Sequence, residues 1–430
     1  MNSELNRLLL ASYLLLVSLL CSAQGQGEWL CDLKARVDSV IGNARMLRTS
    51  QMGLLIYDLT ADSVVYARDE AQTLRPASTM KLLTAITALD RLGAGYRYAT
   101  RLAYRGDIST TITYDEEEAR ADTTGVLRGD VIIKGSMDPM IAEEDLMRFA
   151  NSIKALGIDT IRGSLCADRT MKDGDMYGEG WCWDDDNAML SPLVYKRKDD
   201  MMERFREALA TAGVYHDGTL TVGACPDDAV TAYVVTHSLY DILMPMMKQS
   251  NNLYAESVFY HIGLTKGTPS TAKKARAVVE EVMQKAIDPV ASMPVHRIAD
   301  GSGLSLYNYV SAEIEVAFLR YAYANKNIYG MLYESLPVAA VDGTLKDRMA
   351  GTPAAGNVHA KTGTLSGVSS LAGYCTASNG HLLAFSIMNQ GVMKGVYAKA
   401  LQNRICEAMC GGEKEATASD GQDEAALAGQ

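Results

Sequence analysis

The chain has 430 residues, of which 48% are hydrophobic and 22% are charged, and its formal net charge is −11. This length allows two or three domains with a large buried core, and the composition is that of an ordinary globular protein. The acidic balance argues against nucleic acid as a main partner, because the chain has no concentrated basic segment to face phosphates.

The N-terminus has the pattern of a secretory signal. Arg7 supplies a positive charge, Leu8–Leu20 is apolar, and Cys21-Ser22-Ala23 fits a small-x-small cleavage site. The apolar run is too short to span a membrane comfortably. We therefore expect residues 1–23 to be removed and the protein to be exported without a transmembrane anchor. A lipoprotein is the weaker alternative, because Leu20 is too large for that processing step.

Seven cysteines would remain after this cleavage. They contain no Cys-x-x-Cys and no spacing paired with histidine, so no metal site is predicted. An odd number leaves at least one free thiol. A bridge between Cys166 and Cys182 is possible, and burial as small hydrophobic side chains is an equally good interpretation. The seven are Cys31, Cys166, Cys182, Cys225, Cys375, Cys406 and Cys410.

The elements after the signal follow the pattern of a helix, two strands and a second helix. Helical spacing covers Glu28–Ile41, and strand-like runs follow at Met52–Asp58 and Ser63–Ala67. A further helix is predicted to begin at Ser78, because apolar residues recur at i, i+3, i+4 and i+7 from Leu82 onward.

From about Tyr96 the sequence changes to short β-like runs that are separated by acidic or glycine-rich turns. Examples are Thr100–Tyr104, Val131–Lys134 and Ile161–Cys166. A helix is predicted at Phe205–Gly213, where glycine ends it. This middle part of the chain is therefore predicted to be rich in β-structure.

Helices dominate the rest of the chain. Helical periodicity is present at Leu239–Phe259, Ser270–Met283, Val310–Tyr323 and Tyr397–Met409. Two strands are predicted at Val358–Tyr374 and His381–Met388, with the hairpin signal Asn379-Gly380 between them. The last segment, 411–430, has no periodicity and is predicted to be a disordered tail.

The simplest domain map has one catalytic domain that is split in the sequence. Residues 28–95 and 239–410 would form this domain, and 96–238 would be a β-rich domain inserted into it. We favour this division because the two halves carry complementary parts of one candidate site.

That candidate site rests on three short motifs, which stand in the order typical of serine enzymes that acylate on β-lactams and D-alanyl peptides. They are Ser78-Thr79-Met80-Lys81, Ser250-Asn251-Asn252 and Lys361-Thr362-Gly363. Each motif alone is weak evidence. Ser270-Thr271-Ala272-Lys273 repeats the first pattern, but it follows Ser-x-Asn in the wrong order, and N-capping by Ser270 accounts for it.

The first motif suits a nucleophile and its base. A serine hydroxyl needs a base to remove its proton, and helical spacing places Lys81 on the same face as Ser78. The pKa of a lysine side chain is normally about 10.4. Burial and a neighbouring cation, here Lys361, are expected to lower the pKa of Lys81 and free its amine. At a helix N-terminus, the Ser78 N–H can also stabilise an oxyanion.

The other two motifs supply proton handling and substrate binding. Ser250 can pass a proton between Lys81 and a leaving amine, and Asn252 can hold the lysine and a substrate amide. Lys361, with the hydroxyls of Thr362 and Thr364, forms a donor-rich strand suited to a substrate carboxylate. Gly363 is expected to leave room for the substrate backbone. The N–H of Thr364 is the second candidate oxyanion donor.

At these residues the chain resembles the low-molecular-mass class C penicillin-binding proteins, the D-alanyl-D-alanine carboxypeptidase/endopeptidase family (peptidase family S13). The resemblance extends over roughly Met52–Met409. For the tryptophans of its Trp181–Asp185 segment, packing is favoured over substrate contact. The other segments that resemble the family are Arg128-Gly129-Asp130, Gly135–Pro139, Asp300–Ser305, and Asp342–Leu345 with Arg348.

The resemblance implies an α/β (α+β) fold, in which a β-lactamase/transpeptidase-like domain has an antiparallel sheet flanked by helices and carries the inserted β-rich domain. It implies a periplasmic serine-type D-Ala-D-Ala carboxypeptidase and DD-endopeptidase that cleaves peptidoglycan peptides through an acyl-enzyme on Ser78. β-Lactam antibiotics would inhibit it, and no cofactor is implied. The catalytic roles fall on Lys81, Ser250, Asn252 and Lys361. A nested third domain of the longer members is missing before the Phe205 helix.

Two alternative functions share this fold, a serine β-lactamase that uses the same motifs and a non-catalytic wall-binding protein. A serine β-lactamase would need fast deacylation, for which we identify no loop like that of the class A enzymes. A non-catalytic wall-binding protein would not need the intact motifs. The sequence carries no signal for the oligomeric state or for the balance between carboxypeptidase and endopeptidase activity.

Overall fold

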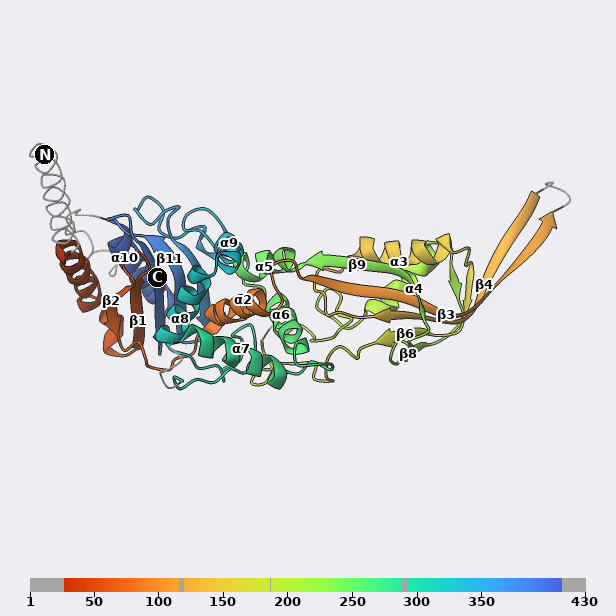
Figure 1. Cartoon of the computed structure of the whole chain (residues 1–430), viewed down its shortest axis with the longest axis horizontal. Helices are drawn as coiled ribbons and strands as arrows, with labels where there is room; N and C mark the ends of the chain where they lie inside the picture. Colours follow the sequence, from red (N-terminus) through yellow and green to blue (C-terminus); the bar gives the residue numbers. More distant parts are fainter. Residues whose placement is uncertain (1–26, 116–119, 186, 288–292, 412–430) are drawn as a thin grey trace, which may run out of the picture.

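The computed structural model describes residues 27–115, 120–185, 187–287 and 293–411. The predicted signal peptide and almost all of the predicted tail lie outside these residues. Within them, no helix is long and apolar enough to cross a membrane. The molecule is elongated, and its two β-sheets lie towards opposite ends (Figure 1).

The first sheet joins the two ends of the described chain. It has five antiparallel strands in the order β10-β11-β12-β1-β2. The early strand β1 pairs with the late strand β12 from Gln51–Gln390 to Asp58–Leu383. The strands are β1 Gln51–Asp58, β2 Ser63–Arg68, β10 His359–Leu365, β11 Val368–Thr376 and β12 Leu382–Gln390.

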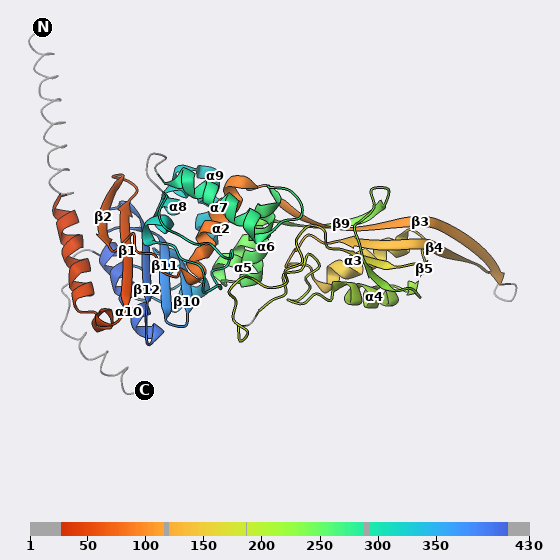
Figure 2. The same ribbon diagram turned by 90° about the horizontal axis from the view of Figure 1, so that it is seen from below.

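Both faces of this sheet are buried, because successive side chains of a strand point to opposite faces and both sets are apolar. Leu54 and Ile56 pack with residues 27–42 and with helix α10, while Leu55 and Tyr57 pack with the larger group of helices. Figure 2 shows residues 27–42 and α2 on opposite sides of the strands. The helices are α2 Met80–Arg91, α5 Leu239–Lys248, α6 Asn252–Leu264, α7 Ala272–Ala286, α8 Ala312–Ala324, α9 Lys326–Ser335 and α10 Gly395–Cys410.

The second sheet comes from the middle of the chain. Its main path runs β7-β5-β4-β3-β9, with β6 paired to β4 and β8 paired to β6. Helices α3 and α4 share a separate hydrophobic core with it. Figure 1 shows β3 and β4 extending beyond the rest of this sheet as a two-stranded arm. The elements are β3 Arg97–Asp115, β4 Arg120–Lys134, α3 Glu143–Ala155, β5 Thr160–Arg162, β6 Leu165–Asp168, α4 Met201–Thr211, β7 Tyr215–His216, β8 Leu220–Val222 and β9 Val230–Ser238.

Most elements predicted from periodicity are confirmed, but several differ. The runs predicted as short at Thr100–Tyr104 and Val131–Lys134 are parts of the long strands β3 and β4. The strand predicted at Val358–Tyr374 is the hairpin β10–β11, because Gly367 at φ +74° permits a two-residue turn. The strand predicted at Ile161–Cys166 is two strands, β5 and β6. The helix predicted at Leu239–Phe259 is interrupted between α5 and α6. Helices α3 and α9 were not predicted.

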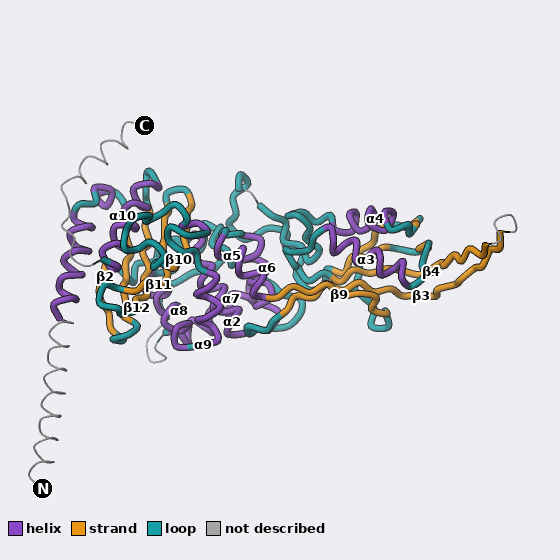
Figure 3. Tube along the Cα trace, turned by 90° about the horizontal axis from the view of Figure 1, so that it is seen from above, coloured by secondary structure: helices purple, strands orange, loops and turns teal. Residues whose placement is uncertain are grey.

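The domain map stays a prediction, although each sheet has its own hydrophobic core. Figure 3 shows α5 and α6 on the side of the first sheet that faces the second one. Helix α5 follows directly from β9, and β3 follows α2 after a short turn. The chain therefore passes between the two sheets next to the helix that carries Lys81.

Candidate active site

Ser78 lies in a tight turn that precedes helix α2. The 3₁₀ turn η2 Ala77–Thr79 leads directly into α2. Ala77 has φ +50°, a left-handed conformation that costs a non-glycine residue about 1–2 kcal/mol. The Thr79 hydroxyl closes the turn, with its Oγ1 2.7 Å from the Pro76 carbonyl oxygen. Ser78 itself is only half-buried, so its hydroxyl is accessible.

Lys81 is fully buried and touches three oxygen atoms. Its Nζ lies 2.8 Å from Ser78 Oγ, 2.7 Å from Asn252 Oδ1 and 2.8 Å from the Ser302 carbonyl oxygen. Burial lowers the pKa of Lys81 to about 7, against the carboxylates of Asp300 and Glu256, which raise it. A large fraction of the amine is therefore neutral near pH 7.

The Ser-x-Asn motif occupies the break between α5 and α6. Ser250 has φ +59°, which turns the chain. The Asn251 side chain caps α6 by accepting from the Leu253 N–H. Asn252 is the first residue of α6, and its side-chain oxygen accepts from Lys81. Asn251 thus caps the helix, while Ser250 contacts Lys361 and Asn252 contacts Lys81.

Lys361 reaches the same site from strand β10. Its Nζ donates to Ser250 Oγ at 2.8 Å and to the Thr362 carbonyl at 2.7 Å, and its side chain is fully buried. Burial, together with the charge of Lys81, lowers the pKa of Lys361 well below its usual value. We expected the charge of Lys361 to lower the pKa of Lys81. The structure shows the reverse, because the charge of Lys81 lowers the pKa of Lys361.

Gly363 allows strand β10 to approach the turn Pro76–Thr79, which carries Ser78 and is called the nucleophile turn below. A Cβ at this position would lie 2.5 Å from the Pro76 carbonyl oxygen and 3.1 Å from the backbone nitrogens of Ser78 and Thr79. We expected the missing side chain to make room for substrate. The structure corrects this, because the space is taken by the turn that carries Ser78.

The hydroxyl residues of β10 lie on its more exposed side. Thr364 is exposed, and Thr362 Oγ1 donates to Thr344 Oγ1 at 2.7 Å. Thr344 belongs to the 3₁₀ turn η3 Gly343–Leu345. The structure thus forms two hydrogen-bonded groups, one of Ser78, Lys81 and Asn252 and one of Ser250 and Lys361. The charge of Lys81 acts on Lys361, so the two groups are neighbours.

Comparison with known proteins identifies the family. Residues 33–195 and 187–409 match the D-Ala-D-Ala carboxypeptidase 3 (S13) family. The chain belongs to this family. The membership confirms the resemblance drawn from the three motifs, and with it the class of enzyme, a serine-type D-Ala-D-Ala carboxypeptidase.

Individual relatives agree with this assignment. A D-alanyl-D-alanine carboxypeptidase of Actinomadura sp. is 29% identical, over 86% of this chain and 83% of the relative. The carboxypeptidase DacB of Haemophilus influenzae is 23% identical, over 80% and 86%. The crystal structure of penicillin binding protein 4 (dacB) from Haemophilus influenzae aligns with a TM-score of 0.75 at 20% identity, covering 86% of this chain and 99% of that one. The predicted fold class is confirmed.

In this carboxypeptidase, the turn Asp300–Ser305 supplies contacts that the motifs did not indicate. Asp300 accepts from the Gly303 N–H at 2.8 Å and the Ser305 N–H at 2.7 Å. Glu256 accepts from the Ser302 N–H at 2.8 Å. Burial, reinforced by Asp300, raises the pKa of Glu256 to about 8. Both carboxyl groups hold the turn that presents the Ser302 carbonyl to Lys81. The segment was noticed only through the family resemblance.

The β-rich middle part of the chain contacts this turn directly. Trp181 Nε1 donates to Asp300 Oδ2 at 2.9 Å, and its ring packs with Met137 and Tyr260. Trp181 thus packs as expected, but Trp183 is 94% exposed. Ser305 Oγ also donates to the Glu179 carbonyl at 2.6 Å, so both hydrogen bonds join this part of the chain to the turn that contacts Lys81.

Two sequence interpretations need correction or completion. The N-cap of α7 is Thr271, which accepts from the Lys274 N–H, whereas Ser270 is buried and donates to the Tyr260 carbonyl at 2.6 Å. All seven described cysteines are free, including Cys166 and Cys182. Among the described residues, no cluster of His, Cys, Asp or Glu could hold a metal ion.

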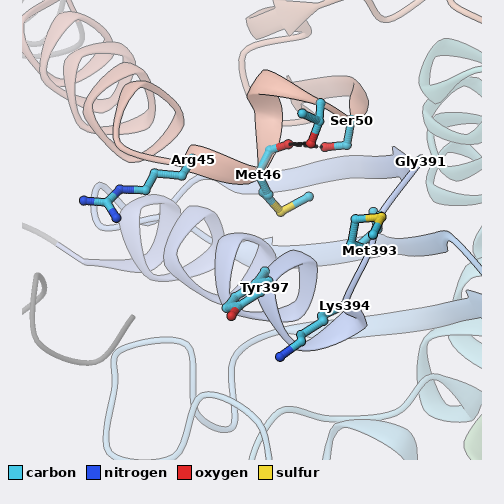
Figure 4. A pocket seen from close by; sticks show the side chains of 9 residues that line it. Arg45, Met46, Ser50, Gly391, Met393, Lys394 and Tyr397 are labelled. Carbon is cyan, nitrogen blue, oxygen red and sulfur yellow. Dashed lines mark hydrogen bonds between the residues drawn. The ribbon is translucent and has the colours of Figure 1, made fainter. Parts of the chain in front are cut away.

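A separate pocket of about 330 Å³ lies between η1 Arg45–Arg48 and the start of α10 (Figure 4). Met46, Met393 and Tyr397 contribute to its lining, and Ser50 donates to the Met46 carbonyl at 2.8 Å. None of its lining residues belongs to the three motifs.

The close approach of the Asp300–Ser305 turn to the nucleophile turn predicts a large cost for a methyl group at Gly303. Gly303 has φ +80°, and a Cβ there would lie 1.8 Å from the Ala77 carbonyl oxygen. We expect Gly303→Ala to lower the free energy of unfolding by more than about 2 kcal/mol, measured by urea denaturation. Gly351→Ala is the matched control, because Gly351 has φ +73° with open space around it, and about 1 kcal/mol is expected. Equal losses would contradict the steric argument.

Proposed function

We propose that this carboxypeptidase cleaves the terminal D-alanyl-D-alanine amide of peptidoglycan stem peptides through an acyl-enzyme on Ser78, and that it cuts D-alanyl cross-links by the same step. The observation that carries the proposal is the set of three contacts made by Lys81. Asn252 Oδ1 and the Ser302 carbonyl can only accept hydrogen bonds. A neutral amine must give its two N–H groups to them, so its lone pair faces Ser78 Oγ.

Acylation follows from this arrangement. The Ser78 hydroxyl proton moves to Lys81 Nζ as Oγ attacks the carbonyl carbon of the penultimate D-alanine. The backbone N–H groups of Ser78 and Thr364 are the proposed hydrogen-bond donors to the oxyanion. When the carbon–nitrogen bond breaks, the leaving amine needs a proton. Water then hydrolyses the ester and restores Ser78.

Ser250 is the proposed relay for that proton. Lys361 donates to Ser250 Oγ, so the Ser250 hydroxyl proton is free to point towards the leaving nitrogen. A proton from Lys81 then replaces it. Asn252 Oδ1 lies 2.7 Å from Lys81 Nζ, and its proposed role is to hold the lysine in place during this proton transfer.

Lys361, Thr362 and Thr364 are proposed to bind the terminal carboxylate of the substrate. The pKa of Lys361 is lowered by burial without ligand, and a carboxylate beside it would favour the charged ammonium again. The Thr362 hydroxyl, which donates to Thr344 in the ligand-free protein, can turn to the same carboxylate.

Inhibition by penicillins and action outside the cytoplasm complete the proposal. A Bdellovibrio bacteriovorus endopeptidase of the same fold has been solved in a penicillin G-acylated form. We propose that penicillin acylates Ser78 here, and that the chain is exported to the periplasm through the signal at residues 1–23.

Intact-mass analysis after penicillin treatment tests the function. A stable adduct of one penicillin on the peptide that contains Ser78 is the expected result, together with release of D-alanine from a synthetic peptide ending in D-Ala-D-Ala. Rapid penicillin turnover without an adduct would instead indicate a β-lactamase. Absence of both reactions in folded protein would indicate a wall-binding protein.

The pH dependence of acylation tests the base. Only neutral Lys81 can accept the Ser78 proton, and its pKa is about 7. The rate of D-alanine release at saturating peptide is therefore expected to rise with pH through about 7, falling about tenfold per unit well below it. Stopped-flow acylation by a fluorescent penicillin should follow the same profile. A rate independent of pH between about 5.5 and 8.5 would contradict the assignment.

A further inference from the structure

A buried carboxyl group lies beneath the nucleophile turn. Glu315, in α8, is fully buried. Its Oε1 is hydrogen-bonded to Thr79 Oγ1, and its Oε2 accepts from Ser386 Oγ of β12 at 2.6 Å. Among the residues that the structure describes, Glu315 has no ion-pair partner. Neither the three motifs nor the proposed mechanism uses this residue.

Counting protons around Thr79 indicates the state of this carboxyl group. Thr79 Oγ1 has one proton but two close oxygen partners, Glu315 Oε1 and the Pro76 carbonyl oxygen at 2.7 Å. The carbonyl can only accept, so a hydrogen bond on that side uses the Thr79 proton. The hydrogen bond between Thr79 and Glu315 then requires a proton on the carboxyl group. An ionised carboxylate would leave one of the two contacts between bare acceptors.

We propose that Glu315 is a positioning residue for Ser78, and that it acts as a neutral hydrogen-bond donor to Thr79. This role rests on the proposed function of Ser78 as the nucleophile. Because Glu315 donates to Thr79 Oγ1, the Thr79 hydroxyl proton can be donated to the Pro76 carbonyl oxygen. That hydrogen bond closes the turn that contains Ala77. Burial raises the pKa of Glu315 to about 7, so a large fraction of this carboxyl group is protonated at neutral pH.

The turn needs such a restraint because its backbone is strained. Ala77 is held at φ +50° between Pro76 and Ser78. The Thr79–Pro76 hydrogen bond spans that residue, and Glu315 ties Thr79 to the sheet through Ser386. Without the tie, Ser78 Oγ would sample positions away from Lys81 Nζ. A misplacement of about 1 Å can cost roughly 10²-fold in rate.

Three variants of the full mature chain separate this role from general stability. Glu315→Gln keeps one donor for Thr79 and one acceptor for Ser386, so acylation within about threefold of the wild type is expected. Glu315→Leu and Thr79→Val remove the donor and the hydroxyl, and each is expected to slow acylation by about 10- to 100-fold. KM for the D-Ala-D-Ala peptide should change less than about threefold, because the substrate contacts remain.

Thr87→Val is the matched control, in helix α2, which follows Thr79 in the chain. The Thr87 hydroxyl is buried and finds no hydrogen-bond partner within the described part of the chain. Its replacement should leave acylation unchanged. Thermal unfolding of every variant confirms that the folded protein is compared. If Glu315→Leu does not fold, the contrast between Glu315→Gln and Thr79→Val carries the test.

The outcomes are distinct. Glu315→Gln as slow as Thr79→Val would overturn the neutral donor. Wild-type acylation in folded Glu315→Leu or in Thr79→Val would overturn the positioning role. A wild-type enzyme that forms no penicillin adduct on Ser78 would overturn the proposed function instead, and this is seen before any variant is compared.

Discussion

Ser78→Ala is expected to abolish both the penicillin adduct and D-alanine release, with a loss of at least about 10⁴-fold in kcat. Ser78 is the accessible hydroxyl beside Lys81 Nζ, at 2.8 Å. Water could still be activated by Lys81, but the covalent step would be gone. Intact-mass analysis and an assay of released D-alanine measure the two losses separately.

Ser270→Ala is the matched control for this prediction, because Ser270 begins the second Ser-x-x-Lys sequence. Its hydroxyl is buried and donates to the Tyr260 carbonyl. Losing that hydrogen bond should cost about 1 kcal/mol of stability and leave the adduct intact. An adduct that persists in Ser78→Ala, or disappears in Ser270→Ala, would show that the nucleophile has been assigned to the wrong serine.

Lys81→Met is expected to lower the acylation rate by about 10³-fold or more, because general-base assistance is lost while Ser78 remains. Methionine fills a similar volume but cannot accept the serine proton. The residual rate should also lose its rise with pH through about 7. Stopped-flow acylation by a fluorescent penicillin at several pH values measures both effects.

Lys172→Met is the control for removing a buried lysine. The Lys172 side chain is buried and pairs with Asp173 at 2.7 Å, away from the three motifs. Its replacement should lower the midpoint of thermal unfolding but leave acylation by the folded protein and its pH profile unchanged. A pH profile retained in Lys81→Met would rule out Lys81 as the base.

Local patterns predicted most of the regular elements and the chemical groups of the site. Helix α2 was predicted from the repeat of apolar residues that face the core, and β1 and β2 from strand-like runs. These features depend on neighbours within a few residues, so a single segment contains the information. The hairpin β10–β11 was missed, because Gly367 stands inside an otherwise continuous strand-like run.

The break between α5 and α6 shows a different limit. Both sides of Ser250 have helical periodicity, so the sequence suggested one helix. The left-handed backbone of Ser250 and the cap supplied by Asn251 stop it there. That break is what allows Ser250 and Asn252 to face two different lysines.

The sequence alone determined which groups are available and in what order: a serine and a lysine, then a serine and an asparagine, then a lysine on a donor-rich strand. Side-chain chemistry and the spacing within each motif are local, so they can be read directly. The tertiary structure decided which groups meet. The Ser302 carbonyl directs Lys81, Gly363 makes room for the nucleophile turn, and Glu315 supports that turn from α8. These contacts join segments far apart in the chain, and two of them use backbone atoms, which every residue has. These three contacts therefore become visible only in the packed structure.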